Sequence, residues 1–101
     1  MIHVIASIRV KEGNLSRFVE IFKSNIPAVL KEKGSISYVP AVDVQTGLPP
    51  QDVDQHRVTV IETWHSLADL TAHMSAPHML DYREKTKNLI EDISLRILEQ
   101  A

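Results

Sequence analysis

At 101 residues, the chain is long enough for one domain with its own hydrophobic core. Its composition, 44% hydrophobic and 24% charged, is that of a soluble globular protein, and a net charge of −2 without a basic stripe argues against a nucleic-acid partner. The absence of cysteine excludes disulfides, thiolate metal sites and cysteine catalysis. No apolar run approaches the ~20 residues of a membrane span, and the N-terminus lacks signal-peptide features, so we expect a cytoplasmic protein without a membrane partner.

The first half of the chain begins with a strand and a helix. Residues Ile2–Val10 alternate between an apolar and a mixed face, which predicts a β-strand. After Gly13, apolar residues recur at helical spacing to about Lys33, and Gly34 is a natural helix stop. Because Pro27 falls inside this segment, we expect a kink or a break between residues 23 and 27.

Two further strands flank an irregular loop. Ser35–Val44 has the composition of a strand, with Ile36, Tyr38, Val42 and Val44 on one side. Thr46–Gln55 contains two prolines, a glycine and two aspartates, which predicts a loop. Arg57–Trp64 alternates again, and a strand there places four residues on one face: Val58, Val60, Glu62 and Trp64.

The third strand leads into a broken helix. Ser66 is an N-cap candidate with Asp69 three residues later, and a helix beginning there carries an apolar stripe of Leu67, Leu70 and Met74, with His73 beside it. Pro77 ends this helix and begins a second, which we expect to run from His78 to about Glu91.

A last strand at Ile93–Leu98 completes the order β-α-β-β-α-β. This order predicts a ferredoxin-like α+β sandwich, in which a four-stranded antiparallel sheet carries its helices on one face, as a single domain over residues 1–101.

The opposite face of such a sheet is not cleanly polar. Ile5, Val39, Ile61 and Leu98 all fall on the less apolar sides of their strands. A sheet with one face in water alternates more strictly than this. We therefore expect a homodimer in which two copies pack sheet against sheet.

Five stretches carry a family resemblance: the start VIASIRVKEG, the turn LKEKGSISYVPAVD, the loop VDVQTGLPP, the run VIETWHSLADLTAHMSAPHMLDYR and the ending ISLRIL. Together they resemble the antibiotic biosynthesis monooxygenase family over nearly the whole chain, and within it the bacterial quinol monooxygenases. The resemblance implies a dimeric α+β barrel with a pocket between sheet and helices in each subunit. It also implies oxidation of a quinol or another electron-rich aromatic by O2 without metal, flavin or haem.

Relatives on the same scaffold have other functions, which leaves alternatives open. Haem-degrading relatives use an Asn, a Trp and a His at positions that we align with Ala6, His73 and Arg83, so haem degradation is not expected. An isomerase of a small metabolite and a non-catalytic dimeric ligand-binding module remain as alternatives.

Two residues are candidates for the chemistry that this resemblance implies. Deprotonation makes a quinol more reducing, and a base with a pKa near neutrality suits that step, which makes His73 the candidate base. Its alternative role is that of a helix-edge histidine bonded to backbone. Glu62 lies on the apolar face of its strand, where a carboxylate needs a partner or an opening to water. It can act as a catalytic acid or form a structural salt bridge.

Aromatic and sulfur-containing side chains on the adjoining elements can line the pocket, and the candidate substrate-binding residues are Trp64, Tyr38, Phe22, His78, Met79 and Tyr82. The alternative for each is an ordinary core, capping or surface position. We expect no metal site, because His65, His73 and His78 are not spaced as ligands on one helical face. We expect no nucleotide cofactor either, since no phosphate-binding motif is present.

Overall fold

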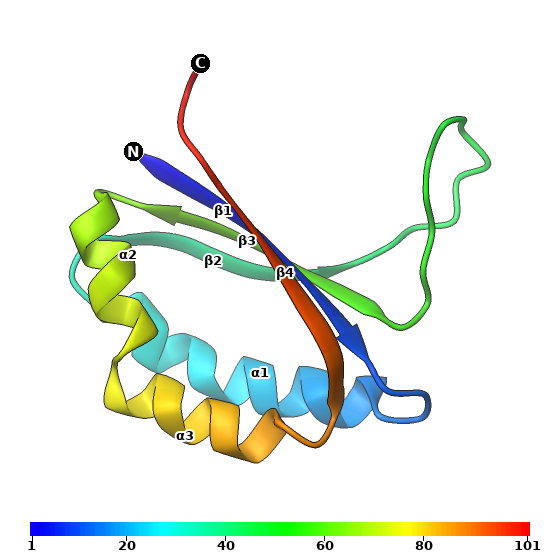
Figure 1. Cartoon of the computed structure of the whole chain (residues 1–101), viewed down its shortest axis with the longest axis horizontal. Coiled ribbons are helices and arrows are strands. Elements are labelled where there is room, and N and C mark those ends of the chain that lie inside the picture. The colour runs from blue at the N-terminus through cyan, green and yellow to red at the C-terminus, as the bar shows by residue number, and fades with distance from the viewer.

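The computed structural model describes residues 1–101 and contains one four-stranded antiparallel sheet with three helices on one of its faces (Figure 1). The elements follow one another as β1 (Ile2–Val10), α1 (Leu15–Leu30), β2 (Ser35–Val42), β3 (Arg57–Trp64), α2 (Leu67–Met74), α3 (Pro77–Thr86) and β4 (Ile90–Leu98). The strands lie in the order β2-β3-β1-β4, so the predicted ferredoxin-like α+β architecture is confirmed.

The core lies between the sheet and the helices. The alternating residues of β1 are nearly inaccessible to solvent, as are Val58, Val60, Glu62 and Trp64 of β3, which confirms the predicted inner face. Register pairs Val4 with Glu62 and Ala6 with Val60, so the two central strands present one continuous inner surface. Phe18, Phe22 and Val29 of α1 pack against this surface. Burial of such side chains provides ~1.5–3 kcal/mol each.

Of the expected kink or break between residues 23 and 27, a break is wrong. One helix runs from Leu15 to Leu30 with Pro27 inside it. Proline removes one backbone hydrogen bond and costs ~3 kcal/mol within a helix. Val29, two residues later, is fully buried in the core, and the burial of this side chain offsets part of that cost.

The second strand ends two residues earlier than expected, at Val42. Its neighbour Asp43 accepts hydrogen bonds from the Arg57 guanidinium and the Asp54 backbone N–H, which turns the chain away from the sheet. At the other end a register shift between Ser35 and Ser37 leaves Ile36 out of the ladder. Ile36 is therefore 49% exposed and does not share the buried face of Tyr38.

The broken helix is confirmed at both predicted boundaries. The Ser66 side chain caps α2 by accepting from the Asp69 backbone N–H, and Pro77 occupies the first turn of α3. The apolar stripe is oriented differently from the prediction, however. Leu70 and His73 are the buried residues of α2, whereas Leu67 and Met74 are exposed.

The boundary between the last helix and the last strand was wrongly predicted. Helix α3 ends at Thr86 instead of near Glu91, and β4 begins at Ile90 instead of Ile93. The Lys11 backbone N–H donates to the carbonyl of Leu89, and Ile90 pairs with Val10 across a β-bulge. Pairing with the central strand thus continues where helical spacing alone suggested more helix.

The outer face of the sheet is uncovered in the single chain. Val39, Ile61 and Leu98 are 50%, 45% and 36% exposed, and Ile5 is half-buried. In Figure 1 the strands cross the middle of the view, α1 and α3 lie below them, α2 stands at their left end, and the loop between β2 and β3 projects to the right. None of the helices combines the length and the apolar run that are needed to cross a bilayer.

Candidate active site

A cavity of about 390 Å³ lies between the sheet and the helices, and we call it the main cavity. Most of its lining is apolar, and every strand and helix contributes side chains to it. Helix α2 contributes through its last turn. Seven polar or ionisable residues also line it: Tyr38, Glu62, His73, Tyr82, Arg83, Thr86 and Lys87. An apolar cavity with a few convergent polar groups is the usual form of a small-molecule site.

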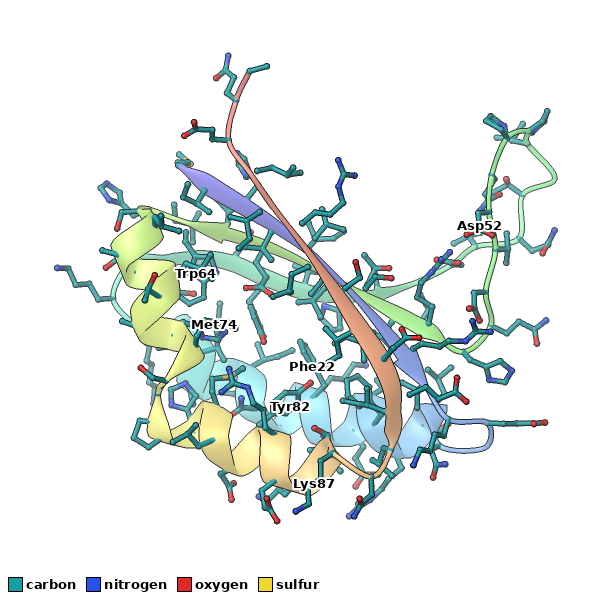
Figure 2. All side chains as sticks on the ribbon, in the orientation of Figure 1. Phe22, Asp52, Trp64, Met74, Tyr82 and Lys87 are labelled. Carbon is teal, nitrogen blue, oxygen red and sulfur yellow. The ribbon has the colours of Figure 1, made fainter.

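Three aromatic rings form one side of the main cavity. Phe22 of α1 stacks on Tyr38 of β2 with ring centroids 5.2 Å apart and planes within 8°. Tyr82 of α3 meets Phe22 edge to face at 5.8 Å. Figure 2 shows Phe22 and Tyr82 in the space between the sheet and the helices. Contact with Phe22 holds the rings of Tyr38 and Tyr82 in place, and both tyrosines line the cavity.

His73 is held on three sides. Its Nδ1 lies 2.7 Å from the Glu32 carboxylate, which can only accept, so Nδ1–H donates to it. Its ring packs against Trp64 at 4.6 Å and meets Tyr38 edge to face at 5.6 Å. The bond to Glu32 defines the tautomer and leaves Nε2 free to accept a proton. His73 lines the main cavity.

His78 is bound by the same carboxylate oxygen. Its Nε2–H donates to Glu32 Oε2 over 2.9 Å. Glu32 lies in the turn after α1, where Gly34 has φ +79° and a Cβ would overlap the Asp69 carboxylate of α2. This close approach of the turn to α2 places Glu32 within reach of both histidines. The two rings converge on one oxygen, which is a hydrogen-bonding arrangement, and no group of three or more metal-ligating side chains is present.

Burial changes the ionisation of both candidate catalytic groups. Loss of water around His73 lowers its pKa below the ordinary 6.5, although the Glu32 charge opposes the change. His73 is therefore neutral at pH 7 and available as a base. Burial raises the pKa of Glu62 to about 7, opposed by a hydrogen bond from Trp64 Nε1–H over 3.0 Å. Glu62 can therefore gain or lose a proton near neutral pH.

The two tyrosines remain protonated, because burial raises the pKa of each phenol above its ordinary value. Both can donate a hydrogen bond to an oxygen of a bound molecule. Arg83 lines the same cavity half-buried, with its guanidinium 4.0 Å from the sulfur of Met74. Its guanidinium places a positive charge in the lining of the main cavity.

The structure brings most of the predicted site residues together. Tyr38, Phe22, Met79, Tyr82, Glu62 and His73 all line the main cavity. Trp64 and His78 lie behind the lining, where Trp64 packs on His73 and His78 bonds to Glu32. Glu62 has Trp64 as its hydrogen-bond partner and forms no salt bridge across the core.

Sequence reasoning missed three kinds of residue. Glu32 was overlooked because it lies 41 positions from His73 in a charged turn, with no local pattern to distinguish it. Arg83 was compared with a histidine of haem-degrading relatives and was not expected to line the cavity. The inner residues of β4, Ile93 and Leu95, were taken for ordinary strand residues, yet they line the cavity.

Comparisons with known proteins agree on one family. The family model described as antibiotic biosynthesis monooxygenase matches residues 1–85. A protein of Escherichia coli strain K12 named "Probable quinol monooxygenase YgiN" is 38% identical, over 98% of this chain and 97% of that protein, and the Shigella flexneri protein of that name matches equally. Two solved structures share the fold. The one from Nitrosomonas europaea has a TM-score of 0.85 and 20% identity, over 99% of this chain and 98% of that chain. The one from Methanosarcina mazei has a TM-score of 0.85 and 22% identity, over 99% of this chain and 92% of that chain.

The raised pKa of Glu62 predicts a pH-dependent stability difference between the wild type and Glu62→Gln. Between the ordinary pKa of 4.5 and the folded value of about 7, the native state binds more protons than the unfolded state, so stability falls as pH rises. We expect wild type to lose on the order of 3 kcal/mol relative to the variant across this window and nothing further above it.

Urea unfolding of both proteins from pH 5 to pH 8 measures this difference. The variant keeps an oxygen for the Trp64 bond and leaves the His73 contribution in place, so the comparison isolates Glu62. A difference that stays constant across the range would show that Glu62 ionises with an ordinary pKa.

Proposed function

The chain belongs to the antibiotic biosynthesis monooxygenase family, and we propose that it is a monooxygenase that oxidises a quinol or a related electron-rich aromatic with O2 in the main cavity. One observation carries the proposal: a neutral histidine, oriented by a carboxylate, lines an apolar cavity together with two protonated phenols. Such a cavity favours a flat aromatic ring and excludes most water, and its histidine, whose pKa burial lowers below 6.5, is neutral and can accept a proton.

We assign His73 the role of general base. Its Nε2 accepts the proton of a quinol hydroxyl, and Glu32 stabilises the imidazolium that forms through the bond to Nδ1–H. The quinolate is more reducing than the quinol and transfers an electron to O2. The resulting radical pair recombines to a peroxide at a ring carbon.

Loss of water from this peroxide leaves a hydroxyquinone. The overall reaction takes one quinol and one O2 to one hydroxyquinone and one water, and the quinol supplies all four electrons. No separate reductant is therefore needed, which agrees with the proposal that the enzyme uses no metal, flavin or haem.

The other polar groups of the main cavity suit the charges of this reaction. The Tyr38 and Tyr82 hydroxyls can donate to the oxygens of the bound ring, and Arg83 can attract the anion that forms. Glu62, with a pKa of about 7, can receive or return the second proton. Phe22 and Met79 contribute apolar contact to the ring, and Trp64 and His78 support the base from behind.

We also propose that the protein is a homodimer joined through the outer sheet face. The exposed Val39, Ile61 and Leu98 on that face support this proposal, because a sheet face in water carries fewer apolar side chains. A second copy packed there would cover them and leave the main cavity, on the other side of the sheet, open to substrate.

Oxygen uptake with a reduced 2-methyl-1,4-naphthoquinone tests the reaction. We expect enzyme-dependent uptake of one O2 per quinol, a hydroxylated quinone as product, and full activity after dialysis against a chelator. Added catalase should release no O2, because water and not peroxide is formed. Tight quinone binding without uptake would favour the ligand-binding module instead, and activity restored only by a particular metal would refute the cofactor-free reaction.

His73→Ala should reduce kcat by ~10²–10⁴-fold, the usual cost of losing a positioned base, with a smaller change in KM. Its residual rate should rise with pH as the quinol ionises unaided. In the wild type, the acid limb of kcat/KM should have its midpoint below 6.5, where the pKa of His73 lies.

The exposed His65 provides the control, since His65→Ala removes an imidazole without touching the cavity. An acid limb near pH 7 that disappears in Glu62→Gln would transfer the role of base to Glu62. Full turnover of His73→Ala at neutral pH would make His73 structural.

Ile61→Lys tests the dimer. A charge at the centre of a sheet-to-sheet interface must be desolvated, so we expect the variant to sediment as a single chain while wild type sediments as a pair at micromolar concentration. Lysine at the comparably exposed Leu80 of α3 should leave the mass unchanged. A wild-type monomer, or an undiminished Ile61→Lys dimer, would contradict the proposed interface.

A further inference from the structure

A second, smaller cavity adjoins the main cavity between α2 and the sheet, and we call it the side cavity. Its volume is about 140 Å³, and it shares three lining residues with the main cavity: Glu62, Met74 and Leu95. The rest of its lining is apolar except for Thr71, whose hydroxyl already donates to the Leu67 carbonyl. The shared residues make the side cavity a lateral continuation of the main one.

An exposed apolar strip on β4 borders both cavities. Ile93, Leu95 and Ile97 are 56%, 47% and 52% exposed, although they lie on the helix side of the sheet. Register explains this, since they pair with Ile8, Ala6 and Val4 of the inner face, but no helix extends over the edge strand.

The opposite border of the side cavity belongs to α2. Leu67 and Met74 line it and are themselves 56% and 41% exposed. Figure 2 shows Met74 at the lower end of α2, between Trp64 above and Tyr82 on α3 below. A flexible methionine between two cavities can move aside for a ligand at low cost.

We propose that the side cavity and the β4 strip form a subsite for an alkyl or isoprenoid chain carried by the quinol ring. This assignment rests on the proposed function, since it places the ring in the main cavity. The ring would lie near His73 and Tyr38, and its chain would pass Met74 and Leu95 into the side cavity.

The chemistry of the side cavity favours a chain over other occupants. At about 140 Å³ it has about a third of the volume of the main cavity, a size that suits a substituent of the bound ring rather than a second ligand as large as the first. Its polar groups are few: one oxygen of Glu62 accepts from Trp64, and the Thr71 hydroxyl donates to the Leu67 carbonyl, so most of the lining offers a substituent apolar contact alone. An apolar chain needs no partner, and its burial removes exposed apolar surface from water.

Binding of oxidised 1,4-naphthoquinones tests this proposal independently of turnover. The probes are the 2-methyl parent and its 2-ethyl, 2-butyl and 2-hexyl homologues, which keep the ring C–H that the proposed hydroxylation replaces. Trp64, the only tryptophan, packs 4.6 Å from the ring of His73 and reports binding by fluorescence quenching. We expect each methylene that enters the side cavity to tighten binding by ~4-fold, with a plateau once the chain emerges.

Two variants place a charge on opposite sides of the side cavity. Leu67→Glu lies at the start of α2, where an acidic residue is compatible with the helix dipole, and Ile97→Glu lies on β4. Both variants should lose the extra affinity that the alkyl chain provides, so the hexyl homologue should bind at least tenfold more weakly than it does to wild type. The affinity of the methyl parent should be unchanged. Leu80→Glu, on an exposed position that lines neither cavity, should retain the full gain.

Three results would overturn the subsite. The first is a methyl parent that binds as tightly as its homologues. The second is a gain that survives both Leu67→Glu and Ile97→Glu, or that Leu80→Glu also removes. The third is that longer chains bind wild type no more tightly, while Ile97→Glu changes the native mass of the protein. That combination would make the strip an interface between copies. Failure of every quinone to bind or react would instead reject the proposed function itself.

Discussion

One oxygen of Glu32 accepts hydrogen bonds from histidines on two different helices, and the arrangement of the site depends on this interaction. Glu32 lies in the turn after α1, His73 on α2 and His78 on α3. A charge-assisted hydrogen bond provides ~1.5–3 kcal/mol, and both are shielded, since the Glu32 side chain is only 13% exposed. The same contacts that join the helices also define the tautomer of His73, so local stability and the orientation of the proposed base have one cause.

The main cavity departs from the ordinary rules of a protein core in a consistent way. Glu62, Tyr38 and Tyr82 place ionisable groups among apolar side chains, and burial favours the neutral form of each. A core built only for stability would fill this space with apolar side chains. An open volume with neutral donors and a neutral histidine suits the proposed oxidation of a quinol, and departures of this kind concentrate at functional sites.

Much of the fold could be predicted because its signals are local. Strand alternation placed Glu62 and Trp64 on the buried face, and Ser66 and Pro77 marked the start of α2 and the first turn of α3. The errors occurred where a long-range contact outweighed a local preference. Burial of Val29 helps to keep α1 continuous through Pro27, and pairing with β1 extends β4 over residues that looked helical. The resemblance to a family provided the expected chemistry, which no spacing in the chain defines.

The sequence by itself determined the order of the elements, the face on which each strand is buried and the presence of a histidine near an apolar helix surface. Tertiary structure alone decided that His73 points inward, that Glu32 holds it and that Trp64 supports it from behind the cavity. It also left the inner side of β4 without a helix above it, which exposes Leu95. The physical reason is that alternation and capping follow from backbone geometry within a few residues, whereas the convergence of side chains 41 positions apart depends on how complete elements pack.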